Sequence, residues 1–274
     1  SAATALAAAG LQPDLVILTD PGHWAMVHLH FAGVRCPVAM PLSAARGTWR
    51  VGEPVRLLNQ GTLLERELLA AVGVEAPLAE PHGTVAATAL ELALAATRGP
   101  VTLAGLDLCA LDSETHVRPN AFDTLLRDGD GRCAPHHALA YDRARLGESG
   151  SRIVGGVRVR VSRSLETYAG WLSHRASAVR GRLFRLHPSP VDLPGADPVD
   201  GARFGVLVAT APPCPAGARL NAPARWPPEA ARRDAARGVL ARWSEILARG
   251  AARARGGPWA EVLGGSPGLA DLAG

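Results

Sequence analysis

Apolar residues recur along this chain in two different patterns, and the two patterns alternate. Short runs without polar residues, of which LVIL at 15–18 is the clearest, are typical of buried strands, whereas apolar residues every three or four positions are typical of helices. The expected strands cover residues 15–18, 38–41, 55–58, 101–104 and 183–186, and the expected helices cover residues 2–9, 24–31, 65–72, 84–97 and 164–179. Because helices of this length connect parallel strands, the pattern predicts an α/β fold with a mostly parallel sheet flanked by helices.

The pattern changes after about residue 150. Val157, Val159 and Val161 alternate with polar residues, which predicts a half-exposed antiparallel strand at the edge of the sheet. Ser164 is the expected N-cap of the helix that follows.

Residues 227–255 predict a long helix rich in alanine and arginine. Its apolar stripe indicates that it packs on another element, and the stripe consists of Val239, Leu240, Trp243, Ile246 and Leu247. We therefore expect one α/β domain over residues 1–200 and a mainly helical extension over residues 201–274.

Composition excludes some kinds of chemistry. The apolar fraction of 47% and charged fraction of 20% are typical of a globular protein, and all 29 basic residues are arginine. Without lysine, a Schiff-base lysine and the lysine of a P-loop are both excluded. A bound phosphate must therefore meet arginine, backbone N–H groups, a helix N-terminus or a metal ion.

Charge and cysteine spacing narrow the expected partners and compartment. The net charge is +4, but the arginines are spread out and aromatic residues make up only 4% of the chain, so nucleic-acid binding is not expected. The chain has no apolar run of about 20 residues, so no membrane span is expected either. The four cysteines lack Cys-x-x-Cys spacing, which favours free thiols in the cytoplasm.

Two aspartates follow expected strands directly. Asp20 comes after the strand at 15–18, and Asp107 comes after the strand at 101–104. Ligands of open parallel sheets bind beyond the carboxyl ends of the strands, so both carboxylates are candidates for a metal ion, a ribose hydroxyl or proton transfer if the strands share one sheet. The alternative for each is an aspartate that caps a turn.

Two further segments carry candidate chemistry. Gly83 and Thr84 open the strongest helix, whose free N–H groups can hold a phosphate, although Thr84 also suits a simple N-cap. His116 follows Asp112 and Glu114 in a polar loop and is a candidate general base beside Asp107, with a solvated loop histidine as the alternative. His23 and His28 lie near Asp20 on an expected helix, where packing is the expected role.

Three segments resemble one known family. They are QPDLVILTDPG at 12–22, HGTVAATALELA at 82–93 and VTLAGLDLCALDSETH at 101–116. They are similar to the strand and aspartate, the Gly-Thr-Val-Ala helix start and the Gly-x-Asp-Leu to Thr-His segment of the MptE-like group. That group joins archaeal 6-hydroxymethylpterin diphosphokinases to bacterial motility-associated glycosyltransferases that act on flagellin. The resemblance covers about residues 1–200.

The resemblance implies a Rossmann-like transferase that binds a nucleotide-activated donor. In the glycosyltransferase version, a CMP-linked nonulosonic acid is transferred to a protein or glycan hydroxyl, and Asp107 or His116 takes the proton. In the diphosphokinase version, ATP and Mg²⁺ are used on 6-hydroxymethyl-dihydropterin, with Asp20 and Asp107 near the metal. A third version is a non-catalytic relative that binds a partner. The nucleotide-binding residues implied by the resemblance are Asp20, Gly83, Thr84, Gly105 and Leu108.

Members of this family usually carry an earlier strand and a Gly-x-Gly-Pro-Ser type of loop that approaches the phosphate. No such loop precedes Ser1 in this sequence. We expect that the chain is a segment of a longer protein, and the alternative is a relative that has lost the loop.

Overall fold

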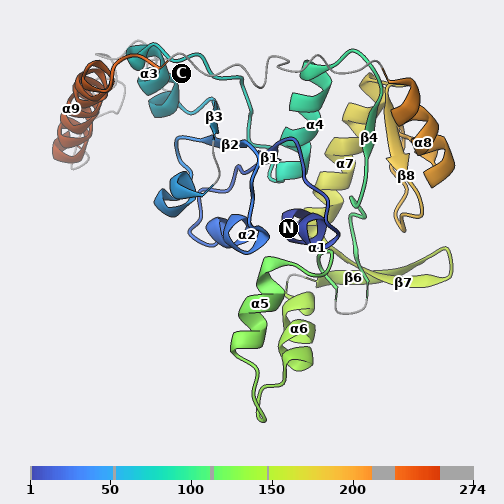
Figure 1. The fold of residues 1–274 in the computed structure, drawn as a ribbon. Coiled ribbons are helices and arrows are strands. Elements are labelled where there is room, and N and C mark those ends of the chain that lie inside the picture. The colour runs from blue at the N-terminus through green and yellow to red at the C-terminus, as the bar shows by residue number, and fades with distance from the viewer. Residues whose placement is uncertain (1, 52–53, 112–113, 147, 212–225, 254–274) are drawn as a thin grey trace. The chain divides into compact units, whose positions relative to one another are not determined.

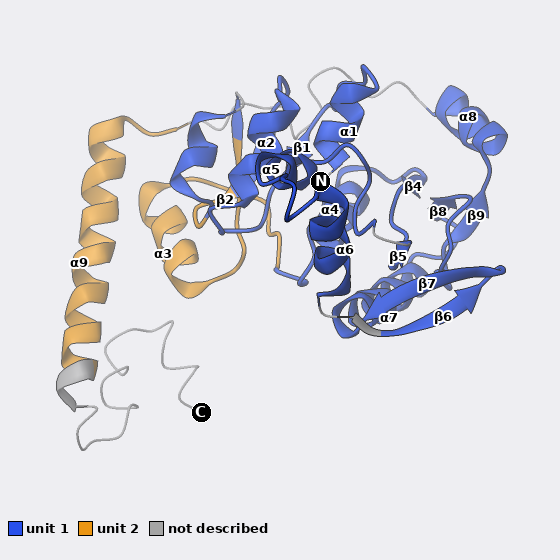
Figure 2. Ribbon diagram, turned by 90° about the horizontal axis from the view of Figure 1, so that it is seen from below, with its two compact units in different colours: residues 1–40, 44–55, 81–221 blue, residues 41–43, 56–80, 222–274 orange. Residues whose placement is uncertain are grey.

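A computed structural model describes residues 2–51, 54–111, 114–146, 148–211 and 226–253, and it has a mixed α/β architecture (Figure 1). The chain divides into two compact units (Figure 2). Unit 1 comprises residues 1–40, 44–55 and 81–221, and unit 2 comprises residues 41–43, 56–80 and 222–274. Residues 56–80 thus group with the C-terminal helix. The expected division into one domain over residues 1–200 and an extension over residues 201–274 stays a prediction.

The first part of unit 1 is a strand-helix-strand segment. Strand β1 (Val16–Ile17) leads into α2 (Ala25–Ala32) and back into β2 (Val38–Pro41), and the two strands pair in parallel, with Val16 opposite Val38. Helix α1 (Ala2–Ala8) precedes this segment, and the 3-10 helix η1 (Arg46–Arg50) follows it. A core of buried side chains fills the segment, and its members are Leu18, Ala25, Leu29, Val38, Met40 and Ala44. The parallel pairing expected from the apolar runs is confirmed.

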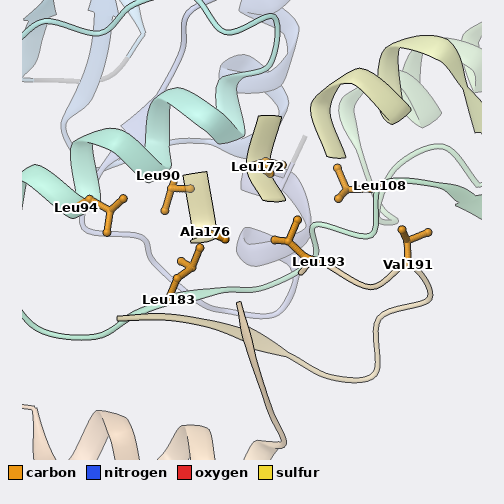
Figure 3. Close-up of a cluster of buried hydrophobic side chains, with 8 residues drawn as sticks. All are labelled: Leu90, Leu94, Leu108, Leu172, Ala176, Leu183, Val191 and Leu193. Carbon is orange, nitrogen blue, oxygen red and sulfur yellow. The ribbon is translucent and has the colours of Figure 1, made fainter. Parts of the chain in front are cut away.

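A second parallel sheet has the strand order β4-β8-β9. It consists of β4 (Val101–Leu103), β8 (Leu183–Leu186) and β9 (Asp197–Val199), with Val101 opposite Leu183. Helices α4 (Val85–Ala96) and α7 (Arg163–Ala178) contribute to its core, whereas α8 (Gly201–Thr210) buries none of its residues. Figure 3 shows the core side chains, which are Leu90, Leu94, Leu108, Leu172, Ala176, Leu183, Val191 and Leu193.

The antiparallel strands form a sheet of their own. It has the order β5-β7-β6 and contains β5 (Ala110–Leu111), β6 (Glu148–Val154) and β7 (Val157–Ser162). Antiparallel pairing of the alternating segment is confirmed, but its position at the edge of the parallel sheet is wrong. Gly155 and Gly156 both have positive φ, which allows a tight turn that folds β6 back on β7, so the nearest segment in sequence supplies the partner strand.

Local capping signals account for several helix boundaries. Gly33 and Gly73 end α2 and α3 (Leu63–Val72) in the left-handed conformation. Thr84 caps α4, as expected. Ser162, rather than Ser164, caps α7, because its hydroxyl accepts a hydrogen bond from the Leu165 N–H at 3.2 Å. Within the described residues, no helix is long and apolar enough to cross a membrane.

Helices α5 (Ala121–Asp128) and α6 (His136–Arg145) form a hairpin that the apolar pattern did not predict. Asn120 and Asp123 form a capping box at the start of α5: the Asn120 side chain accepts from the Asp123 N–H, and the Asp123 carboxylate accepts from the Asn120 N–H. The spacing Asn-x-x-Asp is a usable signal for this helix start.

Unit 2 contains α3 (Leu63–Val72) and α9 (Glu229–Arg253), which pack together. All residues of β3 (Val55–Leu58) after Val55 also belong to this unit. Glu67 of α3 accepts a hydrogen bond from Trp243 Nε1 at 2.8 Å and pairs with Arg242. Packing of the C-terminal helix is confirmed, but only part of the expected stripe is buried. Val239 and Ile246 are 4% exposed, whereas Leu240 is 49% and Leu247 is 63% exposed.

Candidate functional site

The loop after β4 has an unusual backbone. Gly105 and Leu108 both adopt left-handed φ angles, of 67° and 57°, and Leu108 is the one non-glycine residue to do so in the part of the chain that the structure describes. This conformation costs a residue with a Cβ atom about 1 kcal/mol or more. The Leu108 side chain offsets that cost because it is buried in the core around α4 and α7. Packing thus holds the loop in one shape around Asp107.

Arg185, in strand β8, forms a hydrogen bond to this loop through the Leu106 carbonyl. Arg185 is 2% exposed, and its guanidinium donates hydrogen bonds to the Leu106 and Val191 carbonyls and to Ser189 Oγ. Burial lowers the pKa of Arg185, and the nearby Asp107 opposes that shift. One buried arginine therefore ties the loop after β4 to the loop after β8.

Asp107 is held at the same junction. Its carboxylate accepts a hydrogen bond from Ser189 Oγ at 2.8 Å, and Ser189 in turn accepts from Arg185. Because β4 and β8 are parallel neighbours, both loops lie at the carboxyl ends of their strands. This is where open α/β sheets bind ligands.

The start of α4 is shaped by close packing. Gly83 has a φ of 78°, and a Cβ atom built there would lie 2.9 Å from the Tyr168 ring of α7. Thr84 Oγ1 accepts a long hydrogen bond from the Ala86 N–H at 3.4 Å, so its capping role is observed. Beside this turn, the His82 and Trp171 rings lie 4.4 Å apart. Glycine at residue 83 is thus explained by α7 alone, without a phosphate.

Asp20 occupies a turn after β1. Its carboxylate accepts a hydrogen bond from the Gly22 N–H at 2.7 Å, which is the turn-capping alternative. It also acts on His28, whose pKa falls to about 4, mainly through burial and partly through nearby positive charges that include His116 and Arg143, while Asp20 opposes the change.

His116 lies in a polar depression beside the α5–α6 hairpin, whose lining includes Thr115, Phe122 and Arg143. Its Nδ1 is 3.0 Å from Thr115 Oγ1. His116 is an exposed residue, yet the protein atoms around its ring lower its pKa, and Arg143 adds to this effect. The imidazole is therefore neutral near pH 7 and able to accept a proton.

The structure sorts the candidates into separate groups. Asp107 bonds with Ser189, and His116 bonds with Thr115, so the expected pair is not joined by a hydrogen bond. The shared sheet that would align Asp20 with Asp107 is absent, since β1 pairs with β2 while β4 pairs with β8. Asp112 lies outside the described residues.

Metal binding by these carboxylates was expected only for the magnesium-dependent version of the function. Among the described residues, no group of three or more histidine, cysteine, aspartate or glutamate side chains is placed to hold a metal ion. The magnesium role of Asp20 and Asp107 stays a prediction. Cys36, Cys109 and Cys133 are free thiols, as expected.

Sequence reasoning missed the residues that position the candidates. Arg185 and Ser189 organise the Asp107 loop, while Arg143 and Phe122 lie beside His116. A usable signal existed for Arg185, because a charged residue inside the buried strand LFRL needs partners. No sequence signal indicated Arg143.

Comparison with known proteins adds one relative. No protein-family model matches the chain, and no solved structure matches it significantly. An uncharacterized protein of Treponema pallidum (strain Nichols) is 33% identical over 189 residues. The match covers 68% of this chain and 39% of the relative, so the chain spans well under half of that protein's length.

Proposed function

We propose that this chain is a Rossmann-like transferase of the MptE-like group that uses a CMP-activated nonulosonic-acid donor and transfers the sugar to a protein or glycan hydroxyl. The observation that carries the proposal is the Asp107 loop. A carboxylate held by Ser189 and a buried arginine, at the carboxyl ends of two parallel strands, is preorganised for a polar ligand.

The roles of the residues follow from their chemistry. Asp107 uses one oxygen for Ser189, so its second oxygen is available to a ribose or sugar hydroxyl. The first turn of α4 offers backbone N–H groups to the donor phosphate, next to Thr84. Gly105 and Leu108 give the loop its shape.

Transfer needs one proton acceptor. The acceptor oxygen forms a bond to the anomeric carbon, the bond between that carbon and the CMP phosphate oxygen breaks, and CMP leaves with the electron pair. The proton of the acceptor hydroxyl passes to a base. His116 suits this role because its pKa is lowered and its ring is neutral, and Asp107 is the other candidate. Flagellin is one acceptor consistent with the family resemblance.

Thermal-shift titration of the full-length protein tests the proposal. CMP at about 100 times its dissociation constant adds about 2.7 kcal/mol of stability, which raises Tm by several degrees. Asp107→Asn should remove most of this shift, whereas Asp128→Asn, an exposed aspartate at the end of α5, should keep it. Stabilisation by ATP with Mg²⁺ alone would favour the diphosphokinase instead. No response to any nucleotide would favour a non-catalytic relative.

A further inference from the structure

The depression beside the α5–α6 hairpin holds a cation, Arg143, that forms no ion pair within the described residues. The Arg143 guanidinium lies over the Phe122 ring at 3.9 Å from the centroid. The described residues supply Arg143 with no carboxylate partner, whereas its neighbour Arg118 pairs with Glu114 at 3.7 Å and with Asp123 at 3.8 Å. Arg143 thus keeps its N–H donors available in a half-buried position.

The other polar groups of the depression are already occupied. The Asn120 side chain donates to the Val117 carbonyl and accepts from the Phe122 and Asp123 N–H groups. Asp123 accepts from both the backbone and the side chain of Asn120. These bonds fix Asn120 and Asp123, so an incoming ligand meets mainly Arg143, Arg118, His116 and Thr115.

Two histidines beside Arg143 are held in the neutral form. His28 packs edge-on against Phe122, with ring centroids 4.8 Å apart, and its Nδ1 is buried without a hydrogen-bond partner. The charges that act on His28 include Arg143 on α6, His116 in the loop before α5 and Asp20 after β1. Those that act on His116 include Arg143 and Asp123. Burial is the main cause that lowers the pKa of both rings, and Arg143 adds to it, which favours neutral imidazoles beside the arginine.

We propose that this depression binds an anionic group of the substrate, a carboxylate or a phosphate, with Arg143 as its main charge partner and His116 and Thr115 as hydrogen-bonding neighbours. A planar guanidinium already oriented by an aromatic ring suits bidentate recognition of either group. This inference deepens the proposed function, because His116 belongs to both, and it names an acidic substrate as the class to be recognised.

Anion binding has a consequence for protonation. A negative charge near His116 raises the pKa of its imidazole, which makes the neutral ring a stronger base. By linkage, the anion binds more tightly as the pH falls through that pKa. His28 should shift in the same direction.

The test uses histidine ring signals in the NMR spectrum of the full-length protein. Sodium phosphate and sodium acetate are titrated separately against sodium chloride at matched ionic strength, and His116→Gln and His28→Gln assign the two rings. We expect the pKa of His116 to rise with phosphate, acetate or both. Arg143→Gln should weaken that binding about tenfold or more, since a charge-assisted hydrogen bond is lost.

Arg127→Gln is the matched control, because Arg127 is exposed on α5 of the same hairpin and the substitution changes net charge equally. Arg143→Lys, which keeps the charge but lacks the planar fork, should bind with intermediate strength and serves if Arg143→Gln loses helix content. A response to phosphate alone identifies a phosphate site, and a response to acetate alone identifies a carboxylate site. Equal weakening in Arg127→Gln, unchanged binding in both Arg143 variants, or the same response to chloride would overturn the proposal.

The two proposals fail differently. If neither phosphate nor acetate binds but CMP still stabilises the protein, only the proposal of the anion site is refuted. If an anion binds but CMP does not stabilise the protein, only the proposal of the CMP-linked donor is refuted.

Discussion

Replacing Arg185 with methionine tests whether a buried arginine organises the loop that carries Asp107. The side chain is 2% exposed and bonds to the Leu106 carbonyl, the Val191 carbonyl and Ser189 Oγ. Methionine fills similar volume without a donor. The substitution therefore leaves buried acceptors in both loops without their partner.

The expected magnitude follows from those bonds. Each buried acceptor left unpaired costs about 1–3 kcal/mol. The arginine also carries a desolvation cost, seen in its lowered pKa, which methionine recovers. Net destabilisation of about 3–5 kcal/mol is therefore expected, as when one partner of a buried charged contact is removed. This is a large share of the roughly 5–15 kcal/mol of a typical domain.

Hydrogen exchange followed by mass spectrometry measures this effect locally, in peptides that cover β4 and β8. Exchange limited by unfolding should accelerate at least a hundredfold, because about 1.4 kcal/mol corresponds to each factor of ten. Arg180→Met is the control, since Arg180 is an exposed residue just after α7, and its peptides should exchange as in the unchanged protein. Acceleration of less than tenfold in Arg185→Met would refute the role assigned to Arg185.

Three further substitutions test local contacts. Gly83→Ala should lower the stability of unit 1 by more than about 1 kcal/mol, because it combines a positive φ with a contact 2.9 Å from the Tyr168 ring; Gly105→Ala, at a positive φ but in open space, should cost less in a thermal melt. Glu67→Gln should weaken the pairing of α3 with α9 by about 1 kcal/mol at pH 7. The Trp243 hydrogen bond lowers the pKa of Glu67, so its stabilisation is full above the usual glutamate pKa near 4.3 and is lost as the pH falls through the lower folded value.

Each of these expectations has an outcome that contradicts it. If Gly83→Ala and Gly105→Ala lower the free energy of unfolding equally, the contact of the new Cβ atom with the Tyr168 ring does not destabilise the protein. A difference between Glu67→Gln and the unchanged protein that stays constant from pH 7 down to about pH 3 would mean that the Glu67 charge contributes nothing.

Much of the secondary structure was predictable because its signals are local. Strands β2, β3 and β8 occupy the expected residues, since short apolar runs bounded by turn residues leave little choice. Gly73 and Thr84 marked helix ends through backbone conformation and capping, which depend on a few neighbouring atoms. The hairpin of α5 and α6 was not predicted because both helices are short, with 8 and 10 residues, and rich in polar residues, although its capping box was visible in the sequence.

The candidate site was predictable in its parts and not in its grouping. Asp107, Asp20 and His116 were each identified from their places after strands or in a loop. Their bonds with Ser189, Gly22 and Thr115 put them in different groups, which no spacing in the sequence indicates.

The sequence by itself determined many of the strand and helix boundaries, and its lack of lysine excluded a Schiff-base lysine and the lysine of a P-loop. Only the tertiary structure decided that the strands divide among small sheets, that Arg185 joins two loops, and that Arg143 lies beside His116 with no carboxylate partner among the described residues. The physical reason is the distance along the chain over which each interaction acts. Backbone conformation and capping act over a few residues, whereas a buried charge chooses its partners from segments that are distant in the chain and adjacent only after folding.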